Sequence, residues 1–164
     1  MTVAAGKIFT PEDLLSLPDA VDYELVDGNL VERKMGSESS VIAGIILTIL
    51  SNFIRGKRMG CVAGADCSYQ CFPDAPNKVR KPDVSFVRSG RLPGDKSPTG
   101  HTKIAPDLAV EVLSPNDNAS EIDDKIVEYL AAGVKLVWVV NPTSRTVRVH
   151  PSASPPAGFA GGTS

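Results

Sequence analysis

The stretch "DLAVEVLS", residues 107–114, constrains the fold more than any other part of the chain. If it is extended, successive side chains point to opposite faces of a sheet. One face then carries Leu108, Val110 and Val112, and the other carries Ala109, Glu111 and Leu113. Both faces are apolar except at Glu111, which predicts a strand buried on both sides in a sheet covered by helices. An ionised Glu111 is costly there unless a cation, a metal or hydrogen bonds compensate its charge.

The segments around this strand predict further elements. The sequence "YELVDGNLVER" (23–33) is typical of two short strands joined by an Asp27-Gly28 turn. The largely apolar stretch 37–58 is typical of a helix capped by one of its serines. A second helix is expected between Ser120, as its N-cap, and Gly133, as its stop. The remaining strands are expected over residues 61–72, 81–87, 135–142 and 146–150.

Composition indicates one soluble domain. The chain has 164 residues, of which 42% are hydrophobic and 22% charged, enough to bury a core. We expect that domain over residues 1–150 and a disordered, low-complexity tail over 151–164. The formal net charge of -2 gives no overall attraction to nucleic acid, so such binding would need a local basic patch. Residues 78–91 and 55–58 hold clusters of lysine and arginine, although such clusters are often only solvated faces.

The cysteines and the apolar runs bear on compartment. Cys61, Cys67 and Cys71 include no CxxC pair, and no histidine lies at a zinc-finger spacing from them, so we expect free thiols and no zinc site. The first residues do not form a charged-then-apolar signal segment, and the apolar run 41–50 is about half a membrane span. We therefore expect a cytoplasmic protein that does not enter a membrane.

Three polar residues stand out against this background. Asp83 in "RKPDVSFV" (80–87) precedes an apolar strand, and taken alone it is typical of a turn aspartate before an edge strand. Glu111, on the strand predicted to be buried, would give Asp83 a second carboxylate as its partner in a site. Lys125 lies one position off the apolar stripe of its helix, so its ammonium can reach toward the strand ends, or it can form a surface pair with Glu121. The lone histidine of the long loop 88–106, His101, is expected to be solvated.

An aspartate and a glutamate on neighbouring strands, with a lysine nearby, form a site for a hard divalent cation. Two carboxylates hold Mg²⁺ with water positions left open, and the bound cation polarises a phosphoryl oxygen and acidifies water. An ammonium group can orient that water or meet developing charge. This chemistry is typical of phosphodiester hydrolysis.

The order strand-Pro-Asp, strand-Glu, helix-Lys resembles the PD-(D/E)XK nuclease superfamily. More narrowly, the chain resembles the bacterial Uma family of predicted restriction endonucleases in four segments over about residues 10–150. These segments are "YELVDG", "RKPDVSFV", "VEVLSPND" and "KIVEYLAAGVKLVWVVNP". The resemblance implies an α+β, restriction-endonuclease-like fold with a central mixed sheet flanked by helices, preceded by the hairpin.

The resemblance also implies roles for individual residues. Asp83 and Glu111 match the two metal-binding acids, and the backbone carbonyl of Val112 is an implied third ligand. Lys125 matches the family's lysine, which is displaced from the usual strand position, here Leu113, onto the following helix. Glu24 matches an auxiliary acid of the site.

Together these features predict an endonuclease that depends on Mg²⁺ or Mn²⁺ and hydrolyses DNA. The alternative is a non-catalytic nucleic-acid-binding or assembly module on the same fold, because fold alone does not fix function. A homodimer is also expected, because the helix of residues 40–54 is apolar on more than one side and one small sheet cannot cover it.

Overall fold

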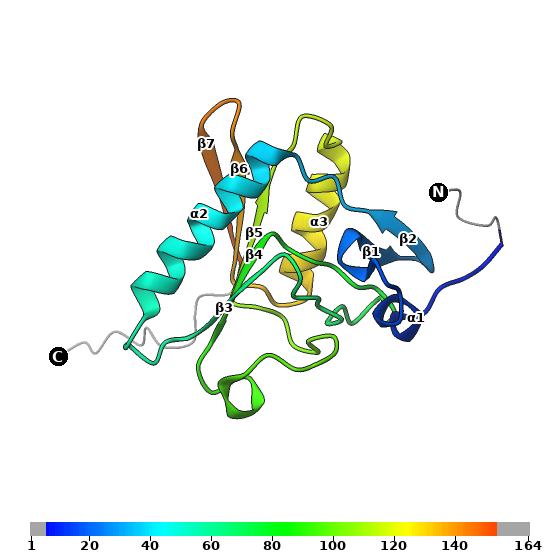
Figure 1. Cartoon of the computed structure of the whole chain (residues 1–164), viewed down its shortest axis with the longest axis horizontal. Coiled ribbons are helices and arrows are strands. Elements are labelled where there is room, and N and C mark those ends of the chain that lie inside the picture. Colours follow the sequence, from blue (N-terminus) through cyan, green and yellow to red (C-terminus); the bar gives the residue numbers. More distant parts are fainter. Residues whose placement is uncertain (1–5, 154–164) are drawn as a thin grey trace.

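The computed structural model describes residues 6–153, which fold around a five-stranded mixed sheet in the order β3-β4-β5-β6-β7 (Figure 1). Its strands are β3 (Gly60–Gly64), β4 (Val84–Arg88), β5 (Leu108–Val112), β6 (Leu136–Asn141) and β7 (Thr146–Pro151). A separate hairpin precedes them, formed by β1 (Tyr23–Val26) and β2 (Asn29–Glu32). The helices are α1 (Pro11–Leu15), α2 (Ser37–Ile54) and α3 (Ala119–Ala131), with 3-10 turns η1 (Ala20–Asp22) and η2 (Pro93–Asp95). The predicted fold class is confirmed, whereas most of the predicted tail, residues 154–164, lies outside the described residues.

The strand predicted to be buried on both sides, β5, is the middle strand of the sheet. It pairs antiparallel with β4 and parallel with β6. Its residues Leu108, Val110 and Val112 pack in one apolar cluster with residues of α2, and Ala109 and Leu113 pack in another with residues of α3. Helices α2 and α3 therefore cover opposite faces of the sheet (Figure 1). Every residue of β5, including Glu111, is buried.

Helix α3 connects the two parallel strands, as parallel pairing requires a crossover. Its buried residues Ile122, Ile126 and Tyr129 face the sheet. The N-cap is Asn118, whose side chain accepts from the N–H of Ser120 at 3.0 Å, so the predicted cap at Ser120 is two residues too late. The helix stops at Gly133 as expected, where φ of 100° suits glycine.

Helix α2 begins after Gly36, where Ser39 Oγ accepts from the Gly36 N–H at 3.0 Å. It ends at Ile54, four residues before the predicted end, and the basic residues that follow it are not helical. Its inner side packs on the sheet, while its outer side exposes an apolar stripe of Val41, Ile45, Ile49 and Phe53. By length and composition alone this is the one helix of residues 6–153 that could cross a membrane, but here it forms one layer of the domain.

The segments between strands are partly buried. The predicted strand 61–72 ends at Gly64, and beyond it Tyr69 makes only isolated pairings with Arg80 and Thr102. His101 is buried, contrary to the expectation of a solvated loop residue. Its Nδ1 lies 2.7 Å from the hydroxyl of Ser68 and its Nε2 lies 2.8 Å from the carbonyl of Pro11, so it ties this loop to α1.

Candidate active site

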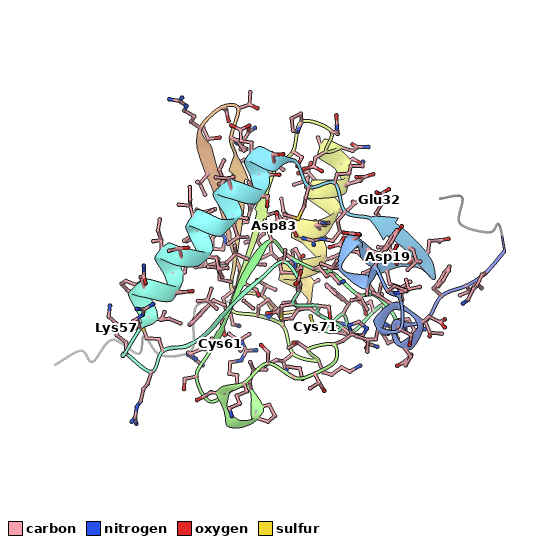
Figure 2. The ribbon with its side chains drawn as sticks, in the orientation of Figure 1. Asp19, Glu32, Lys57, Cys61, Cys71 and Asp83 are labelled. Atoms are coloured by element: carbon pink, nitrogen blue, oxygen red, sulfur yellow. The ribbon has the colours of Figure 1, made fainter. Side chains whose placement is uncertain are left out.

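The sheet register places Asp83 and Glu111 side by side. Val84 pairs with Val110 across β4 and β5, so the residue before Val84 lies opposite the residue after Val110. The Asp83 N–H donates to the Val110 carbonyl at 2.9 Å, which extends the pairing by one residue. Because side chains alternate, both carboxylates lie on the α3 side of the sheet. Figure 2 shows Asp83 in the middle of the molecule, between the sheet, α3 and the hairpin.

Asp83 is buried and held by two donors. Its Oδ2 accepts from the backbone N–H of Val112 at 2.7 Å, and its Oδ1 lies 3.1 Å from Nη2 of Arg33. Burial raises the pKa of Asp83, and the bond from Val112 and the charge of Arg33 oppose that rise only in part. Asp83 is therefore a buried and poorly solvated carboxylate, whereas the turn aspartate that its sequence position suggested would be exposed.

Glu111 is a buried acid held by one hydroxyl and one cation. Its Oε1 accepts from the Tyr129 hydroxyl at 2.8 Å, and its Oε2 lies 3.5 Å from Nζ of Lys125. Burial raises the pKa of Glu111 to about 7; the charge of Lys125 opposes this rise, and the negative charges of Asp83 and Glu24 add to it. Ionisation of Glu111 is thus disfavoured first by burial and then by the two neighbouring acids.

Lys125 bridges two acids. Its Nζ lies 3.2 Å from Glu24 Oε2 and 3.5 Å from Glu111 Oε2. Burial alone would lower its pKa, but Glu111 and Glu24 outweigh that effect and the pKa is raised, so the lysine stays charged. The surface pair with Glu121 does not form; Glu121 instead lies 3.4 Å from Lys34.

Glu24 supports the site from β1. Its Oε1 accepts from the Lys81 N–H at 2.8 Å, and its Oε2 pairs with Arg80 Nη1 at 2.9 Å as well as with Lys125. Burial alone would raise the pKa of Glu24, but these cations and the backbone donor lower it. Arg80 also pairs with Glu128 of α3 at 2.8 Å, so two ion pairs made by Arg80 connect the hairpin to α3.

Asp83, Glu111, Val112 and Lys125 line one small pocket of about 40 Å³. A larger cleft of about 300 Å³ lies between the hairpin and α3. The pocket and the cleft share Arg33, Lys34 and Lys125 as lining residues, so they are adjacent. The structure thus brings the sequence-predicted residues together next to a space that a larger ligand can enter.

Residues 11–157 match the Uma2 family, which is described as "Putative restriction endonuclease". The chain belongs to the Uma2 family. Among solved structures, its fold is similar to that of a crystal structure described as "a putative nuclease belonging to DUF820 from Anabaena variabilis", with a TM-score of 0.72. The two chains are 22% identical, and the match covers 90% of this chain and 82% of the other, which shows a shared fold. No curated protein matches.

The basic cluster of this Uma2 chain is not the solvated patch that the sequence allowed. Arg80 and Lys81 are buried, Lys78 pairs with Glu128 at 2.6 Å, and Arg91 pairs with Asp107 at 2.6 Å. Arg88 is exposed. The other cluster follows α2, where Figure 2 shows Lys57 well away from Asp83.

Two residues of the Uma2 site were missed in the sequence. Tyr129 belongs to the apolar face of α3 by its spacing, and nothing local indicates that its hydroxyl meets Glu111. Arg33 follows the hairpin, and its pairing with Asp83 spans 50 residues of sequence. Only a covariation signal between such positions could have indicated these contacts.

Proposed function

We propose that this Uma2 protein is an endonuclease that uses Mg²⁺ or Mn²⁺ to hydrolyse phosphodiester bonds in DNA. The observation that supports this most directly is the placement of Asp83 and Glu111 on adjacent strands, in one pocket with Lys125. Family membership supports a nuclease, and we propose DNA as the substrate because the family's description is "Putative restriction endonuclease".

The donor set fits a hard divalent cation. Among the residues the structure describes, no cluster of three or more His, Cys, Asp or Glu side chains is placed to hold a metal. Mg²⁺ does not require one, because it commonly takes one or two carboxylates and keeps several waters. Asp83 and Glu111 would supply the carboxylates. The Val112 N–H points at Asp83, and because the N–H and C=O of a strand residue point to the same side, its carbonyl is a reasonable third ligand.

The raised pKa of Glu111 also fits this assignment. Three buried acids, Glu24, Asp83 and Glu111, act on one another, and Lys125 is shared between two of them. A doubly charged ion between Asp83 and Glu111 would relieve this repulsion, and when bound it would polarise a phosphoryl oxygen and acidify a water.

The chain's own residues then have distinct tasks. The Lys125 ammonium, 3.5 Å from Glu111, would orient the attacking water or stabilise developing negative charge. Glu24 keeps that ammonium charged and in place, and Arg80 fixes Glu24. The Tyr129 hydroxyl fixes one oxygen of Glu111 and leaves the other toward Lys125.

A plasmid-nicking assay with Mg²⁺, Mn²⁺ or EDTA tests this function. Asp83→Asn, Glu111→Gln and Lys125→Met should each lower cleavage by about a hundredfold or more. The double variant Asp83→Asn with Glu111→Gln should be little worse than either single variant, because the residues act as a unit. Glu121→Gln is the matched control, since Glu121 is an exposed acid on the same helix that pairs with Lys34 and not with Lys125.

Two outcomes would contradict the proposal. Cleavage retained by Asp83→Asn would place the chemistry elsewhere. A wild-type protein that is folded and inactive with both metals would favour the non-catalytic module, whose DNA binding would rely on Arg80, Lys81 and Arg88. Of these three residues, Arg80 and Lys81 are buried and bonded within the protein, and Arg88 is exposed.

A further inference from the structure

Arg33 lies among the proposed metal ligands, and the function proposed above gives it no role. It directly follows β2, and its backbone N–H donates to the Asp22 carbonyl at 2.8 Å, which fixes where its side chain starts. The guanidinium then reaches Asp83, with Nη2 3.1 Å from Oδ1, and the two side chains are 7% and 8% exposed. This ion pair is therefore nearly shielded from water.

The guanidinium retains unused donors. Its other hydrogen bond within residues 6–153 runs from Nη1 to the Val21 carbonyl at 3.3 Å, which is long. A guanidinium has five N–H donors in a planar fork that matches a phosphate group. Arg33 lines both the small pocket and the larger cleft, so its side chain borders both spaces.

Arg33 and a metal ion would compete for the same oxygen. The Val112 N–H already engages Oδ2 of Asp83, and Arg33 engages Oδ1. A divalent cation shared by Asp83 and Glu111 would have to draw on Asp83 at this position. A doubly charged ion bound to Asp83 would lie close to the Arg33 guanidinium. In a site with little water, their repulsion exceeds that between Arg80 and Lys125, the two single charges that share Glu24 Oε2, and it favours moving the arginine away.

We propose that Arg33 holds Asp83 while the metal is absent, that metal binding displaces it toward the cleft, and that it then binds a phosphodiester group of the substrate. The displaced side chain has room to do so, because the cleft of about 300 Å³ adjoins its present position. A released Arg33 next to a doubly charged ion would turn a balanced ionic cluster into a positively charged one. This inference rests on the proposed function, because it takes Asp83 and Glu111 as the metal ligands.

Titration calorimetry with MnCl₂ in the absence of DNA tests the competition. Arg33→Gln should bind Mn²⁺ at least about fivefold more tightly than the wild type, which is the lower end of typical coupling between two binding events. Arg33→Lys keeps a positive charge at this position, so its Mn²⁺ affinity should stay closer to that of the wild type. Lys34→Gln is the matched control, because the neighbouring Lys34 is exposed, lines the same two spaces and contacts Glu121 instead of Asp83. Its Mn²⁺ affinity should change much less than that of Arg33→Gln, because Lys34 lines the pocket without pairing with Asp83, and circular dichroism in EDTA checks that each variant is folded.

Asp83→Asn separates failure of this inference from failure of the proposed function. If Asp83→Asn abolishes Mn²⁺ binding while Arg33→Gln binds no more tightly than the wild type, the metal site stands and the competition is refuted. If neither the wild type nor Arg33→Gln binds Mn²⁺, the proposed metal site and this inference both fail. Binding by Arg33→Gln but not by the wild type would support the inference in its strongest form.

The substrate half of the proposal has its own measurement. Fluorescence anisotropy with a labelled DNA duplex in CaCl₂ should show weaker binding by Arg33→Gln than by Lys34→Gln. In EDTA, where Arg33 is expected to stay on Asp83, the two variants should bind the duplex alike. Equal affinities in CaCl₂ would show that Arg33 only fills the position next to Asp83 and does not contact the substrate.

Discussion

Replacing Glu111 by glutamine should stabilise the metal-free protein, mainly at neutral and alkaline pH. The folded pKa of Glu111 is about 7, against an ordinary value of 4.5. When the pKa of a carboxyl group is higher in the folded protein than in the unfolded chain, the group makes its full contribution to folding stability at pH values below the unfolded pKa. That contribution is lost as pH rises through the folded pKa. Each pH unit between the two values corresponds to about 1.4 kcal/mol, so ionised Glu111 costs the fold up to about 3 kcal/mol.

Glutamine removes that cost and keeps most contacts. The side-chain oxygen can still accept from the Tyr129 hydroxyl, and Lys125 retains Glu24 at 3.2 Å. At pH 8 in EDTA, Glu111→Gln should therefore unfold roughly 6 to 12 °C above the wild type, given about 2–4 °C per kcal/mol for a chain of this size. At pH 5, just above the unfolded pKa, the difference should shrink to about a quarter of that at pH 8.

Thermal unfolding followed by circular dichroism at pH 5, 6, 7 and 8 in EDTA measures this difference directly. Glu121→Gln provides the control, because it makes the same chemical change at an exposed position of α3. Its difference from the wild type should be small at every pH. A Glu111→Gln difference that does not grow with pH, or a variant less stable than the wild type at pH 8, would refute the electrostatic reasoning.

Two further predictions concern regions outside the site. Burial lowers the pKa of His101, so the fold should lose stability as pH falls below the ordinary value of 6.5, which is opposite in sign to the effect of Glu111. In thermal unfolding, His101→Gln should therefore lose less stability than the wild type between pH 7 and pH 5. An unchanged pH slope would contradict this prediction. The exposed stripe of α2 should be buried in a two-fold homodimer. Sedimentation velocity at micromolar concentration should show a dimer for the wild type and a monomer for Ile45→Glu. The control Val127→Glu, which alters an exposed apolar residue of α3, should remain a dimer. A wild-type monomer would contradict the dimer.

The sequence allowed the main elements of the site to be predicted because they depend on alternation within single strands. The two faces of β5 and the position of Asp83 just before an apolar strand are local properties, and the register then brings Asp83 and Glu111 together. Lys125 could be singled out from its position beside the apolar stripe of its helix, and the family resemblance then gave it a role. Glu24 came from the resemblance alone, because no local pattern connects the hairpin to the site. The structure brings all four residues together.

What could not be predicted is which charged residues become buried. Arg80 and Lys81 have the sequence character of a basic surface, but Glu24 and Glu128, distant in sequence, neutralise Arg80, and the Lys81 ammonium bonds to the Ala20 carbonyl. His101 was expected to be solvated because no residue near it in the sequence indicates a partner. Its partners, Pro11 on α1 and Ser68 in another loop, are far away in the chain. Composition reports the character of a side chain and does not report the tertiary contacts that bury it.

The buried ionic cluster of the Uma2 site is better explained by function than by stability. Glu24, Asp83, Glu111 and Lys125 lie in a region where apolar residues of similar volume would usually be as stabilising or more so, because desolvation offsets much of the attraction within a buried ion pair. The arrangement is also uneven, since within residues 6–153 Asp83 has Arg33 to itself at ion-pair distance, whereas Glu111 shares Lys125 with Glu24. A cluster built for stability would pair each acid fully. A cluster that leaves one glutamate with a pKa of about 7 beside a second carboxylate is instead suited to take up a further positive charge.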